Sequence, residues 1–187
     1  MDRAEEAELV ARLRKGDKTA LRVVYASFSD RIFGFLLRLS RRRDVAEDLH
    51  QETWVSVARH AERLTEGTDL PAWLFTIARN KHRSWRRWAA LDFTRLAFDS
   101  DGPEPEGPSA RPDAGDELAA LEQALEALPM AHREVLLLVG VEGLEPKQAA
   151  EVLGIQPEAL RQRLSRARSA LAEKLEGPAQ SDAAVVR

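Results

Sequence analysis

Arginine and glutamine side chains on a predicted helix near the C-terminus have the chemistry to read nucleic acid. When successive residues are placed 100° apart around the helix axis, leucines and alanines form one stripe. Arg161, Gln162 and Arg166 then lie on or beside the opposite, polar face. A major groove admits a helix, and arginine and glutamine bond guanine and adenine edges there. Because residues near the helix N-terminus reach the bases, we predict base or phosphate contacts for these three. Arg163 and Arg168 lie nearer the packed edge and are predicted to contact mainly phosphates.

A second basic face is predicted on a helix over residues 71–88. At the same spacing, tryptophans and aliphatic residues fill one side, and the other side carries Arg79, Asn80, Arg83, Arg86 and Arg87. Such a stripe neutralises several phosphates, and the amide of Asn80 can read a base edge. Trp73 and Trp85 are predicted to be core residues. Trp88, at the end of the helix, fits either the core or stacking on an unpaired base.

An acidic face is predicted on a helix from Asp44 to about residue 63. Asp44 and Glu47 have the spacing of a capping box. One face is apolar, with Val45, Ala46, Leu49, Thr53 and Val57. The opposite face carries Glu47, Asp48, Gln51, Glu52 and Val55. An acidic face beside an apolar side chain suits docking onto a basic partner, although a solvated face has the same composition.

Charge and turn residues divide the chain. Residues 1–90 hold 18 Lys and Arg against 13 Asp and Glu, whereas residues 91–117 hold 2 against 8. The acidic middle also has four prolines and three glycines after residue 98, which is typical of an extended linker. We therefore predict an N-terminal module at 1–91, a linker at 92–115, a C-terminal module at 116–176 and a tail at 177–187.

The expected fold class is all-α, because apolar residues recur at spacings of three and four. Helices are predicted over residues 5–15, 17–40, 44–63, 71–88, 116–127, 131–142, 146–153 and 157–175. A break is expected near Ser27–Ser29, and Arg41–Arg43 is placed in a turn. The short helix, Gly154 and the longer arginine-rich helix form a helix-turn-helix pattern. That pattern favours DNA contact over a merely solvated helix with surface arginines.

Several function classes are disfavoured. The 187 residues include no cysteine, which excludes disulfides and thiol catalysis. The four histidines show no metal-binding spacing, and no glycine-rich phosphate loop is present. No apolar run is long enough to span a bilayer, and the N-terminus lacks the apolar core of a signal peptide. We therefore expect a cytoplasmic protein without cofactor or metal, and not an enzyme.

Four segments together resemble bacterial RNA polymerase sigma factors of the extracytoplasmic-function subgroup. Two resemble the conserved core of that family: Asp44-Val-Ala-Glu-Asp-Leu-His-Gln-Glu-Thr-Trp54 and Pro71-Ala-Trp-Leu-Phe-Thr-Ile-Ala-Arg-Asn80. Two resemble its C-terminal DNA-binding domain: Leu125-Glu-Ala-Leu-Pro129, with Arg133-Glu-Val-Leu-Leu-Leu138 shortly after it, and Arg161-Gln-Arg-Leu-Ser-Arg-Ala-Arg168. Their order and spacing, over about residues 8–175, carry the resemblance.

The resemblance implies roles for the matching positions. Asp48, Gln51 and Glu52 match the motif that docks on the polymerase clamp helices. Asn80 and its neighbouring arginines match the helix that handles the minus-ten promoter element. The loop Thr65–Leu70, which includes Thr68, matches the loop that holds a flipped-out base of that element. The C-terminal helix matches the reader of the minus-thirty-five element, and the acidic linker matches a segment that threads toward the polymerase active-site cleft.

The implied function is promoter recognition and DNA opening with core RNA polymerase, regulated by an anti-sigma factor. The chain departs from the family pattern in the short helix, where Glu-Ile-Ala is replaced by Gln148-Ala-Ala and Pro146 stands near the usual Ser or Thr. Two alternatives remain. A decoy that binds only an anti-sigma factor would be expected to lack Arg161 and Arg166. An ordinary helix-turn-helix repressor leaves the acidic helix and the Trp/Arg helix without a role.

Overall fold

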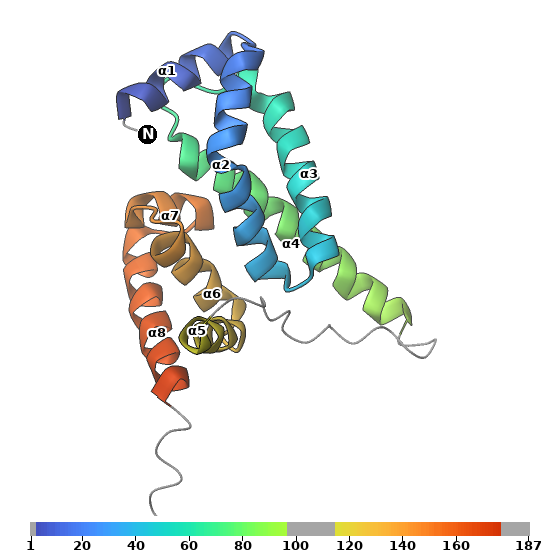
Figure 1. Cartoon of the computed structure of the whole chain (residues 1–187), viewed down its shortest axis with the longest axis vertical. Coiled ribbons are helices and arrows are strands. Elements are labelled where there is room, and N and C mark those ends of the chain that lie inside the picture. The colour runs from blue at the N-terminus through green and yellow to red at the C-terminus, as the bar shows by residue number, and fades with distance from the viewer. Residues whose placement is uncertain (1–2, 97–114, 177–187) are drawn as a thin grey trace, which may run out of the picture.

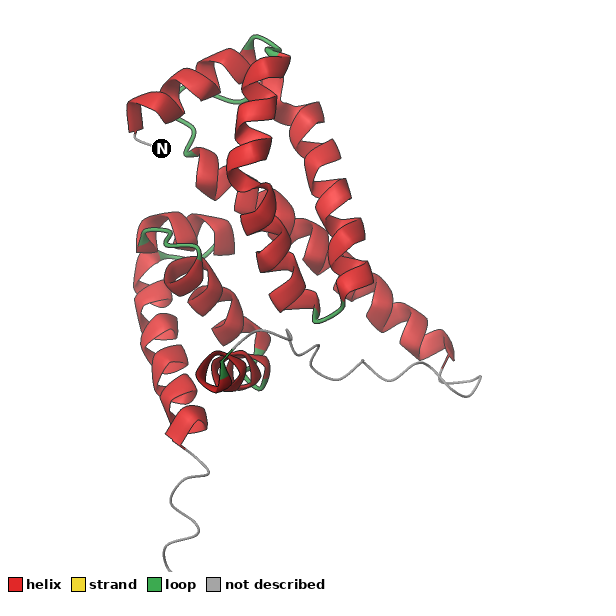
Figure 2. Ribbon diagram, viewed as in Figure 1, coloured by secondary structure: helices red, strands yellow, loops and turns green. Residues whose placement is uncertain are grey.

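The computed structural model describes residues 3–96 and 115–176, and every regular element in these two ranges is helical (Figures 1 and 2). The N-terminal module contains α1 (Arg3–Arg14), α2 (Lys18–Ser40), α3 (Arg43–His60), the short η1 (Ala61–Arg63) and α4 (Leu70–Leu96). The C-terminal module contains α5 (Asp116–Glu126), α6 (Met130–Leu136), the π-helical η2 (Leu137–Val141), α7 (Pro146–Leu153) and α8 (Pro157–Glu176). The all-α prediction is confirmed.

The N-terminal module is built on an antiparallel α2–α3 hairpin, and α4 crosses and packs against both of its helices (Figure 1). Phe35 of α2 and Phe75 of α4 meet edge to face, with ring centroids 5.3 Å apart. The apolar face predicted for α3 is buried in this core. Thr53 is the polar member of that face, and its hydroxyl donates to the Leu49 carbonyl at 2.7 Å.

Two local predictions in this module are wrong. The α2 helix runs without a break through Ser27–Ser29, because Val24, Phe28 and Ile32 all face the core at helical spacing. Asp44 does not cap α3, since the helix already begins at Arg43. Its carboxylate instead accepts hydrogen bonds from the Arg42 guanidinium, at 3.2 Å from Nε, and this pairing lowers the pKa of Asp44.

The C-terminal module contains the predicted helix-turn-helix. The α7 helix ends at Gly154, which has a φ of +65°, and α8 begins three residues later. Leu160, Leu164 and Ala167 form the buried stripe of α8, which packs against α6. The buried Arg133 guanidinium donates to backbone carbonyls at the end of α5 and in the loop after it, and so fixes α5 on α6.

The two modules pack against each other. The α7 helix lies against α4, and α6 touches α2 (Figure 1). The α4 helix continues to Leu96, past residue 92 where the linker was predicted to begin. The remaining linker positions, 97–114, and the predicted tail, 177–187, lie outside the described residues.

Candidate nucleic-acid interface

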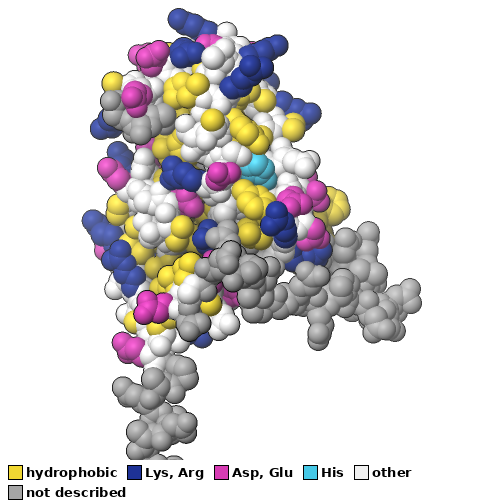
Figure 3. Space-filling view, viewed as in Figure 1, with side chains coloured by type: hydrophobic (Ala, Val, Ile, Leu, Met, Phe, Trp, Pro, Cys, Tyr) yellow, Lys and Arg dark blue, Asp and Glu magenta, His cyan; other side chains and the backbone are white. Residues whose placement is uncertain are grey.

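The polar face predicted for α8 is exposed. Arg161, Gln162, Arg166 and Arg168 are all solvent-accessible, and Arg163 is half-buried toward the packed edge. In Figure 3, lysine and arginine side chains follow the left edge of the molecule, where Figure 1 places α8. Arg161 is held by Glu158, one turn earlier, at 3.1 Å from Nε. A row of cations beside a glutamine on an open helix face can engage phosphates and base edges.

The basic face of α4 is split. Asn80, Arg83, Arg86 and Arg87 are exposed as predicted. The prediction of an exposed Arg79 is wrong, because only 9% of this residue is accessible and its guanidinium faces the C-terminal module. Helical periodicity assigned Arg79 to the polar side of α4, and α7 covers that part of the side.

A groove between the end of α3 and α4 adds polar groups to this face. It has a volume of about 510 Å³ and is lined by Trp73, Asn80, Lys81, His60 and Arg63, among others. Trp73 and Trp85 are both half-buried and pack against the hydrophobic core. The prediction that they are core residues therefore holds in part. Trp88 is 69% exposed. Cations and an indole edge in one groove suit an unpaired nucleotide strand.

The loop before α4 is a compact turn. The Thr68 hydroxyl donates to the Thr65 carbonyl at 2.8 Å and accepts from the Thr65 N–H at 3.2 Å. Asp69 caps α4 by accepting from the Ala72 N–H at 2.9 Å. Gly67 supplies the positive φ of +78° that the turn requires. Thr68 is half-buried. Because these hydrogen bonds fix the turn, the loop is preorganised.

The acidic face of α3 points to solvent. Glu47, Asp48, Gln51, Glu52 and Val55 are all exposed, as predicted. Glu52 lies at the boundary with the basic face, where its carboxylate is 3.2 Å from the Lys81 ammonium. The two charge types therefore occupy adjacent but distinct surfaces of the N-terminal module.

An aromatic cluster beside the acidic face was missed by sequence reasoning. The Tyr25 ring of α2 lies 4.7 Å from the Trp54 ring of α3, centroid to centroid. The Trp54 indole N–H donates to His50 Nε2 at 2.9 Å, and burial lowers the pKa of His50. Tyr25 and Val55 are both nearly half exposed. The signal was the position of Trp54 within one turn of Gln51, which places an aromatic ring next to the acids.

Family comparisons agree with this arrangement. Residues 24–90 match sigma-70 region 2, and residues 118–171 match sigma-70 region 4. The sigma factor CarQ of Myxococcus xanthus is 36% identical over 167 residues, which cover 88% of this chain and 94% of CarQ. The ECF sigma factor EcfG of Rhodopseudomonas palustris (strain TIE-1) is 36% identical over 143 residues, covering 75% and 77%. The chain belongs to the extracytoplasmic-function group of RNA polymerase sigma factors.

A solved structure shares the fold of this sigma factor. RpoE of Bartonella quintana, in a co-crystal with the anti-sigma factor NepR, superposes with a TM-score of 0.69 at 28% identity over 86% of this chain and 97% of the RpoE chain. As a sigma factor, the protein binds core RNA polymerase and directs promoter recognition and transcription initiation. Within residues 3–96 and 115–176, no helix is long and apolar enough to cross a membrane.

Proposed function

We propose that separate surfaces of this sigma factor bind core polymerase and promoter DNA. The acidic face of α3, with Asp48, Gln51, Glu52 and Val55, docks on core polymerase, and Tyr25 and Trp54 extend the contact. The groove at Asn80, together with Arg83, Arg86 and Arg87, takes the minus-ten strand, and the loop at Thr68 holds a flipped base. On α8, Arg161, Gln162 and Arg166 read the minus-thirty-five element, and Arg163 and Arg168 contact phosphates.

The separation of charge by surface carries this proposal. The acids of α3 are solvent-accessible, and the arginines of the outer half of α4 and of α8 lie on other faces. A basic polymerase surface would be attracted to the first face and repelled by the others, while DNA phosphates would show the opposite preference. Arg79 joins the DNA-binding set only when the C-terminal module moves away from it.

We also propose an anti-sigma factor as a partner, because the similar RpoE was solved with NepR. The protein would act in the cytoplasm, where core polymerase works, and would catalyse no reaction of its own. Its N-terminal module would correspond to residues 1–91 and its C-terminal module to residues 116–176. The exposed Arg161 and Arg166 favour a DNA-binding sigma factor over a decoy that binds only an inhibitor.

Run-off transcription with purified core polymerase on a promoter library tests the proposal. Asp48→Arg is expected to abolish polymerase association while the protein stays folded, because it places a cation on the docking face. Arg161→Ala is expected to keep polymerase association and lose selective initiation. Thermal denaturation and sedimentation with core polymerase separate these effects. If both variants lose polymerase association, or both keep it with unselective initiation, the assignment of the two surfaces fails.

A further inference from the structure

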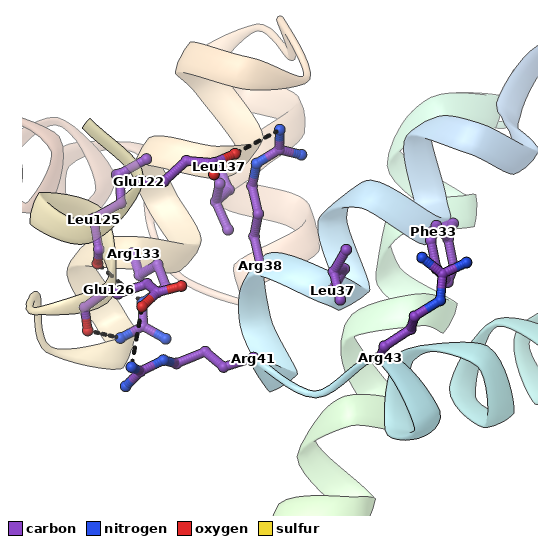
Figure 4. A pocket seen from close by; sticks show the side chains of 10 residues that line it. All are labelled: Phe33, Leu37, Arg38, Arg41, Arg43, Glu122, Leu125, Glu126, Arg133 and Leu137. Atoms are coloured by element: carbon purple, nitrogen blue, oxygen red, sulfur yellow. Dashed lines mark hydrogen bonds and ion pairs between the residues drawn. The ribbon is translucent and has the colours of Figure 1, made fainter. Parts of the chain in front are cut away.

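A cavity of about 140 Å³ lies where the end of α2 meets α5 and α6 (Figure 4). One wall is a face of α2, on which Phe33, Leu37 and Arg41 recur at every fourth residue. Leu125 of α5 and Leu137 of α6 also line it. None of these side chains belongs to the surfaces assigned above to polymerase or promoter DNA. The proposed function therefore leaves this cavity without a role.

The apolar part of the lining sets the size of a ligand. An apolar cavity of about 150 Å³ holds a benzene ring, so this cavity fits a body of about six carbons. The Phe33 ring can pack edge to face or offset against an aromatic ligand, and the leucines remove the rest of its surface from water. A nucleic-acid strand is much larger than the cavity, which excludes DNA as the occupant.

Guanidinium groups outnumber carboxylates in the lining, which contains Glu122, Glu126, Arg38, Arg41, Arg43 and Arg133. Each glutamate pairs with one arginine, Glu122 with Arg38 at 3.9 Å and Glu126 with Arg41 at 3.0 Å. Arg133 donates instead to backbone carbonyls, which carry no net charge. Burial, and after it the charge of Arg41, lowers the pKa of Arg133, and Glu126 offsets this in part. The cavity therefore keeps a positive charge that no carboxylate of its lining balances.

Arg41 also has a donor without an acceptor. Its Nη2 donates to Glu126 at 3.0 Å, whereas within residues 3–96 and 115–176 its buried Nε has no hydrogen-bond partner. Nε and Nη2 form the edge of a guanidinium that an anion fills with two oxygens. Arg79 uses this edge for both oxygens of Glu134, at 2.9 and 3.2 Å. The corresponding edge of Arg41 is half used, and an anion would complete it.

The backbone of Arg41 carries a steric cost. Its φ is +60°, and in the two described ranges it is the only residue other than glycine with a positive φ. It ends α2 in the left-handed conformation that glycine adopts most easily. Strained positions of this kind concentrate at ligand-binding sites. The turn itself would be served better by glycine, so the use of an arginine here rests on its side chain.

We propose that this cavity is a binding site for a small organic anion with an apolar body. The carboxylate or phosphate of the ligand lies at Arg41 and Arg133, and the body packs against Phe33, Leu37 and Leu125. Small-molecule sites commonly combine an apolar lining with a few polar groups that fix the orientation of the ligand. The assignment is independent of which surfaces bind polymerase and promoter DNA.

Isothermal titration calorimetry of the full chain with matched probes tests the site. Benzoate and phenyl phosphate carry the two headgroups on the same ring, benzamide keeps the shape without the charge, and inorganic phosphate has the charge without the ring. At least one aromatic anion is expected to bind at a single site with a dissociation constant below about 1 mM. Benzamide and inorganic phosphate should bind at least about tenfold more weakly. The tighter aromatic anion identifies the headgroup. Weaker binding of both aromatic anions, or benzamide that binds equally well, overturns the proposal.

Three variants locate the ligand. Arg41→Gly removes the guanidinium, and it should stay folded because glycine adopts the positive φ without strain. It is expected to weaken binding of the aromatic anion by at least about tenfold. Leu37→Trp fills the cavity, keeps every charge and should abolish binding. Arg22→Gln is the control, since it removes a cation from an exposed position of α2 outside the cavity and should leave the affinity unchanged.

Far-UV circular dichroism checks that each variant is folded. Wild-type affinity in Arg41→Gly, or in a folded Leu37→Trp, places the anion elsewhere and refutes the site. The same holds if Arg22→Gln weakens binding as much as Arg41→Gly, because the effect then reports net charge alone. Should Leu37→Trp fail to fold, the comparison of Arg41→Gly with Arg22→Gln decides the matter.

Discussion

The buried histidine of α4 makes the stability of this sigma factor depend on pH. His82 is 1% exposed, and the charge of Arg133 in the C-terminal module acts on it. Burial, and after it the positive charges of Arg86 and Arg133, lowers its pKa to about 4, although the backbone of Leu39 acts in the opposite direction and Arg79 adds a smaller effect. The ring is therefore neutral in the folded protein at neutral pH.

Proton counting gives the sign of the effect. Between pH 6.5 and pH 4 the unfolded chain binds a proton at His82 that the folded chain does not, so the free energy of unfolding rises with pH across this window and is fully developed above pH 6.5. At about 1.4 kcal/mol per pH unit, the loss of stability on acidification reaches about 2 kcal/mol at pH 5 and about 3 kcal/mol at pH 4.

His82→Leu and His82→Gln remove this titration. Urea denaturation at pH 7, 6 and 5 should show that the wild-type free energy of unfolding falls relative to that of each variant by about 2 kcal/mol between pH 7 and 5. Carboxylates that titrate near pH 4 affect all three proteins alike and cancel in the difference. Parallel pH profiles for the wild type and both variants would refute the assignment of a buried, neutral His82.

Three further outcomes are expected. Arg133→Met should cost the C-terminal module roughly 2–3 kcal/mol in chemical denaturation, because it removes the charged donor to backbone carbonyls at the end of α5 and in the loop after it; an unchanged midpoint would contradict this. Gly154→Ala should cost about 1–2 kcal/mol in the same assay because the residue has a φ of +65°, whereas Gly140→Ala, in open space without a positive φ, should not destabilise. Arg166→Ala should lower the salt slope of promoter binding by about 1 if it contacts a phosphate, and an unchanged slope would remove it from the interface.

The faces of single helices could be predicted because each depends on one periodicity. The buried stripe of α3 and its exposed acids result from spacing alone, and so does the exposed row of α8. Helix ends were less predictable where two signals compete. At the start of α3, Arg42 and Asp44 form an ion pair, and the helix begins two residues earlier than a capping aspartate would place it.

The position of Arg79 could not be predicted from its own helix. Periodicity says which residues share a side, but which neighbour covers that side depends on Glu134, distant in sequence and placed by another module. The same limit applies to Glu142, which comes directly after the π-helical turn at 137–141. In a regular α-helix through that turn, the Glu142 side chain would point in another direction. A π turn contains an extra residue and therefore rotates the residues after it about the helix axis. The ion pair of Glu142 with Arg31 depends on that rotation.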